Sequence, residues 1–399
     1  MRTDLGWNLD PTVTFLNHGS FGACPEPVLE VQREWRDRLE RGPVTFLDRE
    51  LEGHLDRARA AVGAFLSADP AGLAFVPNAT TASNAVLRSL RFEPGDELLT
   101  CDYEYNATLN TIRAAAERDG ARMVIAAIPF PTGGDDEIVD ALLAAVTPRT
   151  RLAVVSHVAS PTGLILPMER IVRELDARGI DTFVDGAHAP GMIRLALDDL
   201  GAAYYSGNGH KWLCGPKGAA FLWVRADRRE GVHPTNVSHG ANATRSDRPR
   251  FRLEFDWVGT GDPTPALTLP AAIDWMAGLE PGGWPALMAA NRAMALVARD
   301  KLVGSLGGPV PAPDASIGAM ASVPIPGLRT DQEAAWLHEA LFDEDRIEVP
   351  VVPWPVPGAR PSPTDPPRSV LVRVSAQRYT ESEDIDRLVA ALGRRLAAQ

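Results

Sequence analysis

The sequence predicts an α/β protein, with a large domain built on a mostly parallel sheet and a smaller α+β domain after it. Two observations lead to this fold class. Apolar runs alternate with helix-like segments through the middle of the chain, and the pattern changes from about residue 281. The 399 residues are also too many for one small core. We therefore expect a large domain over residues 1–280, a small domain over residues 281–399, and an N-terminal segment that can pack on the small domain.

The middle of the chain supplies the parallel sheet. Short apolar runs typical of buried strands occur at residues 97–100, 122–126, 151–156 and 181–184, with helical patterns between them at residues 107–118, 137–145 and 168–177. Strands and helices alternating in this way predict βαβ units with right-handed crossovers. Ligands of such sheets bind outside the carboxyl ends of the strands. Residues 156–160, Asp185 and the region of Tyr105 should therefore meet at one edge.

The C-terminal part reads as a separate α+β unit. Helical patterns occur at residues 284–306, 331–342 and 382–397, and β-like runs occur at residues 347–352 and 370–374. The proline-rich residues 353–363 between these runs predict a surface loop that joins no sheet, since proline lacks the N–H that a sheet needs.

Composition excludes several classes of function. The formal net charge of −12 argues against a nucleic-acid-binding or anionic-membrane surface. One basic cluster runs against this trend and predicts a solvated loop or a local anion contact: Arg245, Arg248, Arg250 and Arg252. No apolar stretch reaches the roughly 18 residues needed to span a bilayer, and residues 1–7 do not resemble a signal peptide.

The cysteines point to a cytoplasmic protein without a metal centre. They are three, far apart, and form no C-x-x-C motif: Cys24, Cys101 and Cys214. This spacing argues against a disulfide framework and against a cysteine-based zinc site. We expect a cytoplasmic enzyme that binds no metal.

Asp185 and Lys211 carry the clearest chemistry. Asp185 ends an apolar strand-like run, and Lys211 follows 26 residues later, after a segment rich in glycine and tyrosine. A buried acid and a lysine amine that can be desolvated into a nucleophile are what a pyridoxal 5′-phosphate (PLP) enzyme requires. The lysine forms the Schiff base, and the acid keeps the pyridine nitrogen protonated. The plainer readings are a surface lysine and a helix-capping aspartate.

Residues 77–81 fit a phosphate. The run PNATT follows an apolar strand pattern at residues 73–76 and opens a helix, where free N–H groups and hydroxyls bind anions. An ordinary helix N-cap is the better reading of this segment taken alone, and the lysine in the same chain reverses the odds. His188 and His210 flank the acid–lysine pair, so contacts to the cofactor are favoured over two satisfied buried histidines.

These motifs resemble the class V aminotransferase family of fold-type I PLP-dependent enzymes. The resemblance rests on VDGAHAPG at residues 184–191 and on GHKWLCGPKG at residues 209–218. It is closest to the isopenicillin N epimerase-like branch, whose opening motif is similar to LNHGSFG at residues 16–22. The branch's closing motifs are similar to EVPV at 348–351 and RVSAQRY at 373–379. The similarity extends from about residue 10 to residue 395.

The resemblance implies a role for each matching residue. Lys211 and Asp185 are catalytic, and Tyr105 stacks on the cofactor ring. His188 and Ser160 lie near the ring hydroxyl, while Ala79, Thr80, Asn208 and His210 surround the phosphate. Thr260 reaches the phosphate of the neighbouring subunit, which implies a homodimer. Asn17, His18 and Arg373 bind the substrate, Arg373 through the α-carboxylate.

Two departures from the family limit what is implied. Cysteine desulfurases of this superfamily carry a nucleophilic cysteine before the carboxylate arginine, and residues 350–373 contain none. A persulfide mechanism is therefore not expected. Ser160 also stands where many relatives have asparagine.

The resemblance favours an epimerase or racemase acting at Cα of an amino acid, through a carbanion that the cofactor stabilises. A C–S lyase and an aminotransferase share the same first steps and stay open as alternatives. An epimerase also needs a second proton donor, for which Tyr105, His18 and a bound water are candidates. A non-catalytic PLP-fold protein is the remote alternative. Motifs of nucleotide-binding proteins, serine hydrolases and zinc peptidases are absent from the sequence.

Overall fold

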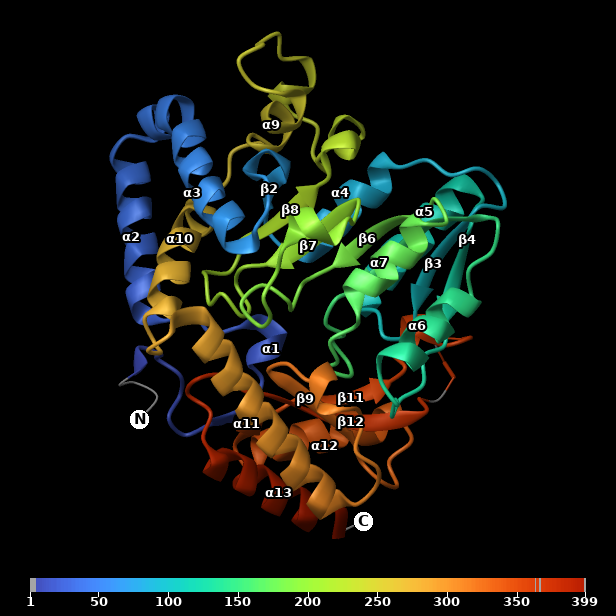
Figure 1. The fold of residues 1–399 in the computed structure, drawn as a ribbon. Helices are drawn as coiled ribbons and strands as arrows, with labels where there is room; N and C mark the ends of the chain where they lie inside the picture. Colours follow the sequence, from blue (N-terminus) through green and yellow to red (C-terminus); the bar gives the residue numbers. More distant parts are fainter. Residues whose placement is uncertain (1–4, 363, 366, 398–399) are drawn as a thin grey trace.

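A seven-stranded sheet organises the larger part of the molecule (Figure 1). The computed structural model describes residues 5–362, 364–365 and 367–397. The strand order is β2-β8-β7-β6-β5-β3-β4, and only β8 runs antiparallel to its neighbours. The strands are β2 (Leu73–Val76), β3 (Glu97–Cys101), β4 (Arg122–Ala126), β5 (Thr150–Ser156), β6 (Asp181–Asp185), β7 (Tyr204–Asn208) and β8 (Ala220–Val224). The predicted fold class and the mostly parallel sheet are confirmed.

Helices cover both faces of this sheet, so its central strands are buried on both sides. Successive side chains alternate between the faces: in β5 and β6, Val155 and Val184 pack with α6 and α7, whereas Val154 and Phe183 pack with α4 and α5. The covering helices are α4 (Ala79–Ser89), α5 (Asn106–Asp119), α6 (Asp135–Ala144), α7 (Met168–Asp176), α8 (Leu197–Leu200) and α9 (Arg250–Phe255).

A group of N-terminal helices was not predicted from the sequence. They are α1 (His18–Phe21), α2 (Glu26–Arg41) and α3 (Leu51–Leu66), with a π-helical turn between the last two at Thr45–Glu50. Helices α2 and α3 both pack against α10 (Thr264–Ala277). Helix α10 contains Pro270, and proline at such a position weakens a helical sequence signal.

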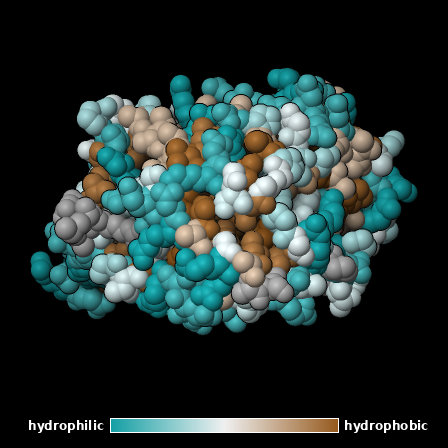
Figure 2. All heavy atoms as spheres, turned by 90° about the horizontal axis from the view of Figure 1, so that it is seen from below, coloured by the Kyte–Doolittle hydropathy of each residue, from teal (hydrophilic) through white to brown (hydrophobic). Residues whose placement is uncertain are grey.

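The C-terminal part contains a three-stranded antiparallel sheet of order β11-β12-β9, with helices packed against it. Its elements are α11 (Gly283–Leu306), β9 (Met320–Pro324), α12 (Asp331–Asp343), β11 (Val351–Trp354), β12 (Ser369–Ser375) and α13 (Ser382–Ala397). Figure 2 shows the molecule from this side, with hydrophobic residues visible in the middle of a largely hydrophilic face. The division into domains at residue 280 stays a prediction.

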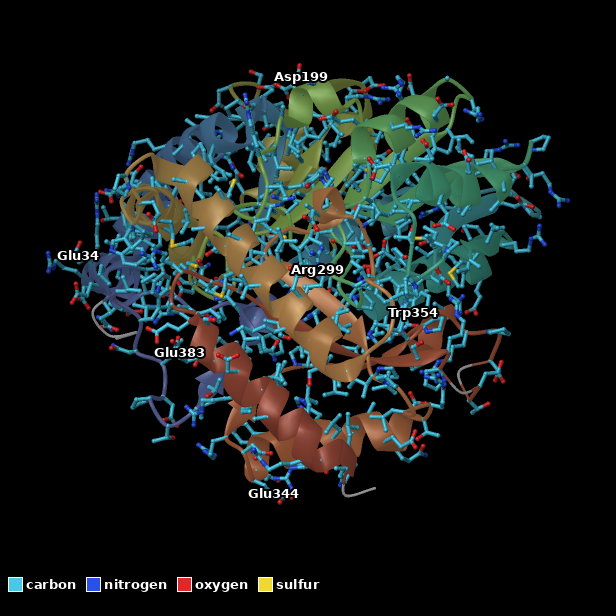
Figure 3. All side chains as sticks on the ribbon, turned by 60° about the horizontal axis from the view of Figure 1, so that its bottom comes forward. Glu34, Asp199, Arg299, Glu344, Trp354 and Glu383 are labelled. Carbon is cyan, nitrogen blue, oxygen red and sulfur yellow. The ribbon has the colours of Figure 1, made fainter. Side chains whose placement is uncertain are left out.

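The proline-rich segment differs from its predicted form. Pro353 and Trp354 belong to β11 and pair with Val370 and Ser369, so the expectation that residues 353–363 join no sheet was wrong. Strand β11 lies at the edge of its sheet, where proline is tolerated because the outer N–H groups need no partner. Trp354 is buried and labelled in Figure 3. Pro363 lies outside the described residues.

Hydrogen bonds at Gly358 hold the next part of this segment against α5. The Gly358 N–H donates to the Asn106 side chain at 2.9 Å, and Arg113 donates to the Gly358 carbonyl at 2.8 Å. Arg360 is buried and makes a bidentate ion pair with Asp331. The segment is therefore held to the large sheet's helices rather than left as a free loop.

The basic cluster is a set of local anion contacts. Arg245 and Arg248 both pair with Glu52, and Arg250 pairs with Glu254. The expectation of a solvated loop was wrong for Arg252, which is buried and donates to backbone carbonyl groups. Among the described residues, no helix is long and apolar enough to cross a membrane.

Two short segments that are far apart in the sequence pair between the two larger sheets. Strand β1 (Thr14–Phe15) pairs in parallel with β10 (Ile347–Glu348), so the predicted β-run at 347–352 is divided between β10 and β11. Asn17 strengthens this contact by donating to Glu348 at 2.8 Å. Figure 1 shows the short helix α1, which follows at once, between the seven-stranded sheet and β9. Residues 1–4, part of the segment judged not to be a signal peptide, lie outside the described residues.

Candidate active site

Three polar side chains lie in register across β5, β6 and β7, and two of them, Ser156 and Asp185, are the last residues of their strands. Ser156 pairs with Asp185, and Asp185 pairs with Ser206. They follow the alternation of Val154 and Phe183, so they face the side that α4 and α5 cover. The predicted meeting of polar residues at one edge of the sheet is thus visible in the strand register.

Asp185 is buried and accepts three hydrogen bonds. Thr108 of α5 donates to Oδ2 at 2.9 Å, while the Ala187 N–H and the Ser206 hydroxyl donate to Oδ1 at 3.0 and 3.3 Å. Hydrogen bonds to an ionised carboxylate favour the charged form. Gly186 follows because a Cβ at this position would collide with the ring of Tyr205. The site therefore presents a fixed carboxylate.

Lys211 lies in the turn after β7, beside His188. Its Nζ is 3.0 Å from His188 Nε2. Burial lowers the pKa of Lys211 to about 7, with a further contribution from the positive charge of Arg373, partly offset by Asp185. Burial also places the pKa of His188 well below its usual range, so this imidazole is neutral. The Trp212 indole donates to His188 Nδ1 at 3.4 Å, so the hydrogen of the neutral imidazole is on Nε2, the nitrogen that faces the Lys211 amine.

The chain contains only three lysines, and the other two are engaged elsewhere. Lys217 donates to the Gly22 carbonyl at 2.9 Å. Lys301 lies on α11 and pairs with Asp386 at 2.6 Å. A Schiff base needs a lysine amine, so Lys211 is the residue at which this edge of the sheet can form one.

His18 contacts the backbone of the turn that carries Lys211. Its ring is fully buried, with Nε2 3.0 Å from the Lys211 carbonyl oxygen and Nδ1 2.7 Å from the Tyr379 hydroxyl. Burial lowers the pKa of His18 to about 3. Both ring nitrogens are therefore used within the protein. Gly22 lets its segment approach the lysine turn closely, because a Cβ at this position would collide with the His210 carbonyl.

Arg373 of β12 reaches the same edge from the three-stranded sheet. Its guanidinium donates to the Ser160 carbonyl at 2.6 Å, the Ser160 hydroxyl at 3.1 Å and the Ser20 hydroxyl at 3.1 Å. These partners are neutral, and among the described residues none makes an ion pair with Arg373. Burial lowers its pKa to about 10, so it stays charged at neutral pH. A buried cation without an anionic partner is suited to binding a carboxylate.

Asn17 is linked to this arginine indirectly, through the hydroxyl of Ser20. Ser20 donates to Asn17 Oδ1 at 2.5 Å, so the Asn17 amide holds the hydroxyl that Arg373 contacts. The structure therefore places Asn17 and His18 behind the arginine and the lysine respectively.

Three of the four predicted phosphate residues, Ala79, Thr80 and Asn208, lie at the start of α4. Asn208 accepts the Ala79 N–H at 2.9 Å, and Thr80 is exposed in the first turn. His210 lies in the lysine turn, and its buried Nδ1 has no hydrogen-bond partner among the described residues. Asn78 accepts the Thr81 N–H at 2.8 Å, so an ordinary N-cap is present as well.

Tyr105 and Thr260 are two predicted residues with exposed side chains. Tyr105 caps α5 and is 48% exposed. Thr260 is exposed in the loop before α10 and makes no hydrogen bond to another described residue. Sequence reasoning missed Thr108, Ser206 and Glu104 as residues of the site. Signals for two of them were available, since Ser206 lies between Asp185 and Lys211 and Glu104 directly precedes Tyr105.

These observations match a known family. The sequence model of the class V aminotransferases matches residues 30–388. The chain belongs to this family. The predicted membership is confirmed, and with it the assignment as a PLP-dependent enzyme.

Class V relatives resemble the chain over nearly its whole length. Isopenicillin N epimerase of Streptomyces clavuligerus is 38% identical over 398 residues, covering 96% of this chain and 95% of the relative. The probable chloroplastic L-cysteine desulfhydrase of Arabidopsis thaliana is 30% identical over 405 residues, covering 96% of this chain and 83% of the relative.

Solved structures of PLP enzymes share the fold. The cystine C–S lyase C-DES, in complex with cysteine persulfide, has a TM-score of 0.78 at 23% identity, over 96% of this chain and 98% of that one. A cysteine desulfurase from Escherichia coli also has a TM-score of 0.78, at 20% identity, over 100% and 98% of the two chains. The predicted fold-type I architecture is confirmed.

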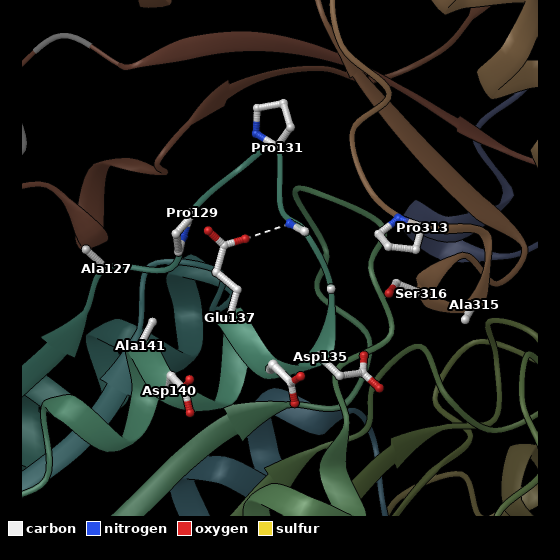
Figure 4. A pocket seen from close by; sticks show the side chains of 13 residues that line it. Ala127, Pro129, Pro131, Asp135, Glu137, Asp140, Ala141, Pro313, Ala315 and Ser316 are labelled. Carbon is white, nitrogen blue, oxygen red and sulfur yellow. Dashed lines mark hydrogen bonds between the residues drawn. The ribbon is translucent and has the colours of Figure 1, made fainter.

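The residues present fit PLP. Lys211 would provide the amine and Asp185 a carboxylate for the pyridine nitrogen, and the buried His210 Nδ1, which has no hydrogen-bond partner among the described residues, could serve a polar group of the cofactor. A second, acidic hollow lies elsewhere, at the N-terminus of α6 (Figure 4). There Glu137 accepts the Gly133 N–H at 2.6 Å, and no lysine lines the hollow. It is unrelated to the PLP site.

The lowered pKa of Lys211 has a measurable consequence. Only the neutral amine attacks the PLP aldehyde, so the rate at which the apoprotein captures PLP should rise with pH through a midpoint near 7 and level off above it. Stopped-flow measurement of the visible absorbance will test this. Free lysine amines provide the comparison, with the ordinary midpoint of about 10.4. A midpoint in that upper range would show that Lys211 is solvated.

Proposed function

We propose that this protein epimerises or racemises an amino acid, or a peptide with a free α-amino group, at Cα. The observation that carries the proposal is the 38% identity to isopenicillin N epimerases over almost the full length of both chains. The desulfhydrases are about 30% identical and extend beyond this chain. The same residues at the site suit either reaction, so the support for epimerisation comes from the degree of similarity.

Each residue has a defined task in this proposal. Arg373 binds the substrate carboxylate in place of its present neutral partners. The Lys211 amine would remove the proton from Cα and could return it. PLP supplies a ring that accepts the electron pair left at Cα. Asp185 holds the negative charge that keeps this ring cationic, and Thr108 and Ser206 fix the orientation of Asp185.

Tyr105 is the proposed second proton carrier. Epimerisation requires a proton on the face opposite Lys211, and the buried ring of His18 is bonded behind the lysine turn. Tyr105 is half exposed, and its phenol lies within electrostatic range of Arg373. Thr260, exposed and without a hydrogen bond, is proposed to contact a second subunit in a homodimer.

The reaction type can be tested in D2O, starting separately from the L and the D form of each candidate substrate. An epimerase will bring both to the same stereochemical mixture, with deuterium at Cα. Release of ammonia with a keto acid and no inversion would instead identify a lyase. Keto acid formed in a stoichiometric amount, with pyridoxamine phosphate, would identify an aminotransferase.

Tyr105→Phe should separate the two proton transfers. The substitution keeps the ring and removes the hydroxyl, so inversion should fall by about 100-fold, as expected for loss of one acid–base group. Exchange of the Cα proton with solvent, which needs only Lys211, should persist with retention. Chiral chromatography with mass spectrometry measures both quantities on one sample. Equal losses of exchange and inversion would rule out Tyr105 as the second carrier.

A further inference from the structure

Glu104 is a second buried carboxyl group at the PLP edge of the sheet. It lies between β3 and α5, directly before Tyr105, and is fully buried. Its Oε1 accepts both the Ser156 hydroxyl and the Tyr105 N–H at 2.7 Å. Its Oε2 is buried and has no hydrogen-bond partner among the described residues. A buried carboxylate in which one oxygen accepts no hydrogen bond would be strongly destabilised relative to the protonated acid.

Asp185 is close enough to affect the ionisation of Glu104. Ser156, which donates to Glu104, stands in register with Asp185 on the adjacent strand. Two carboxylates that interact at one site do not ionise independently, and one of them keeps its proton. Which one keeps it depends on the hydrogen bonds that each accepts.

The hydrogen bonds favour charge on Asp185. Three donors, shared between both of its oxygens, stabilise the Asp185 carboxylate. Glu104 has two donors, and both bind one oxygen, so the other oxygen is free to carry a proton.

We propose that Glu104 is a positioning residue that holds a proton on Oε2, so that Asp185 is the ionised carboxyl group of the pair, and that fixes the backbone of Tyr105. The inference rests on the family's cofactor and does not depend on the reaction type. Burial, and then the charge of Asp185, raise the pKa of Glu104 to about 8, in agreement with this assignment.

Glu97 provides a matched control in the same part of the chain. It is also fully buried, on β3, but Arg122 and Arg149 pair with it and Thr147 donates to it at 2.6 Å. The Thr147 hydroxyl makes the largest contribution to lowering the pKa of Glu97. Two buried glutamates are thus expected to be in opposite protonation states.

Infrared difference spectroscopy of the holoenzyme near pH 6.5 tests the proposal directly. The wild type should show the carbonyl stretch of a protonated carboxylic acid, and Glu104→Gln should lack it. Glu97→Gln should retain the band, because its carboxylate is ionised. A band that persists unchanged in Glu104→Gln would overturn the proposal, as would its absence from the wild type.

PLP affinity gives a second readout that needs no turnover. Glutamine reproduces a neutral carboxyl group, so Glu104→Gln should bind PLP about as tightly as the wild type. Glu104→Leu removes the acceptor for Ser156 and Tyr105 and should weaken PLP binding about tenfold. A Glu104→Gln variant that binds PLP as weakly as Glu104→Leu would show that the charge is needed and would overturn the proposal. Failure of epimerisation in the D2O assay would leave both readouts intact.

Discussion

Replacing Lys211 with alanine is expected to remove the visible Schiff-base absorbance of the holoenzyme and to lower turnover by about 10⁴-fold. In the proposed mechanism the side chain both bonds the cofactor and moves the Cα proton, so the substitution removes both functions together. The fold should survive, because the substitution removes a partly buried amine whose lowered pKa reflects unfavourable burial. Absorbance spectra, steady-state kinetics and circular dichroism measure the three outcomes.

Lys217→Ala is the matched control. Lys217 lies six residues further along the chain, and its one hydrogen bond within the described part of the chain goes to the Gly22 carbonyl, so this variant should keep the visible band. Borohydride reduction followed by peptide mapping identifies the modified lysine in each protein. If the Lys211→Ala protein still formed a reducible bond to PLP, one of the two other lysines would be responsible and the assigned site would be wrong.

Replacing Arg373 with methionine should raise KM for the amino acid by about 100-fold while PLP stays bound. A bidentate pair with a carboxylate contributes two charge-assisted hydrogen bonds, and about 1.4 kcal/mol corresponds to each tenfold step. The protein should not lose stability, because the guanidinium is buried with neutral partners only. Arg373→Lys should recover a part of the affinity, since lysine keeps the charge and loses the planar fork.

Arg360→Met separates substrate binding from general effects of losing a buried arginine. Arg360 is also buried in the C-terminal part, but it pairs with Asp331 and holds the proline-rich segment. This control should lower the melting temperature and leave KM unchanged. A parallel change in KM for both variants would mean that Arg373 acts through structure rather than by binding the carboxylate.

The sequence predicted those parts of the site that are local in the chain. The strand before Asp185, the turn around Lys211 and the helix start near Ala79 all follow from short patterns of apolar, small and polar residues. Strands 122–126 and 73–76 were also placed correctly, because buried strands have continuous apolar runs between turn residues. The parallel arrangement followed from the alternation of elements.

Contacts between distant elements were not predictable in the same way. Thr108 meets Asp185 only because α5 packs across the end of β6, and no local pattern marks that contact. Pro353 was assigned to a loop because an isolated sequence does not show which strand lies at a sheet edge. His18 and Asn17 were identified as site residues, but their positions behind Lys211 and Arg373 depend on the fold of both chain ends.

The pairing of β1 with β10 also affects the order in which parts of the protein can fold during synthesis. Asn17 and Glu348 are 331 residues apart, so β1 cannot pair with β10 until the segment around residue 348 has left the ribosome. At about 5–20 residues per second this delay is roughly 20–70 s. The seven-stranded sheet can form during that time, whereas α1 can join both Lys211 and Arg373 only afterwards. A nascent chain should therefore acquire its cofactor-binding competence as one of the last steps of its biogenesis.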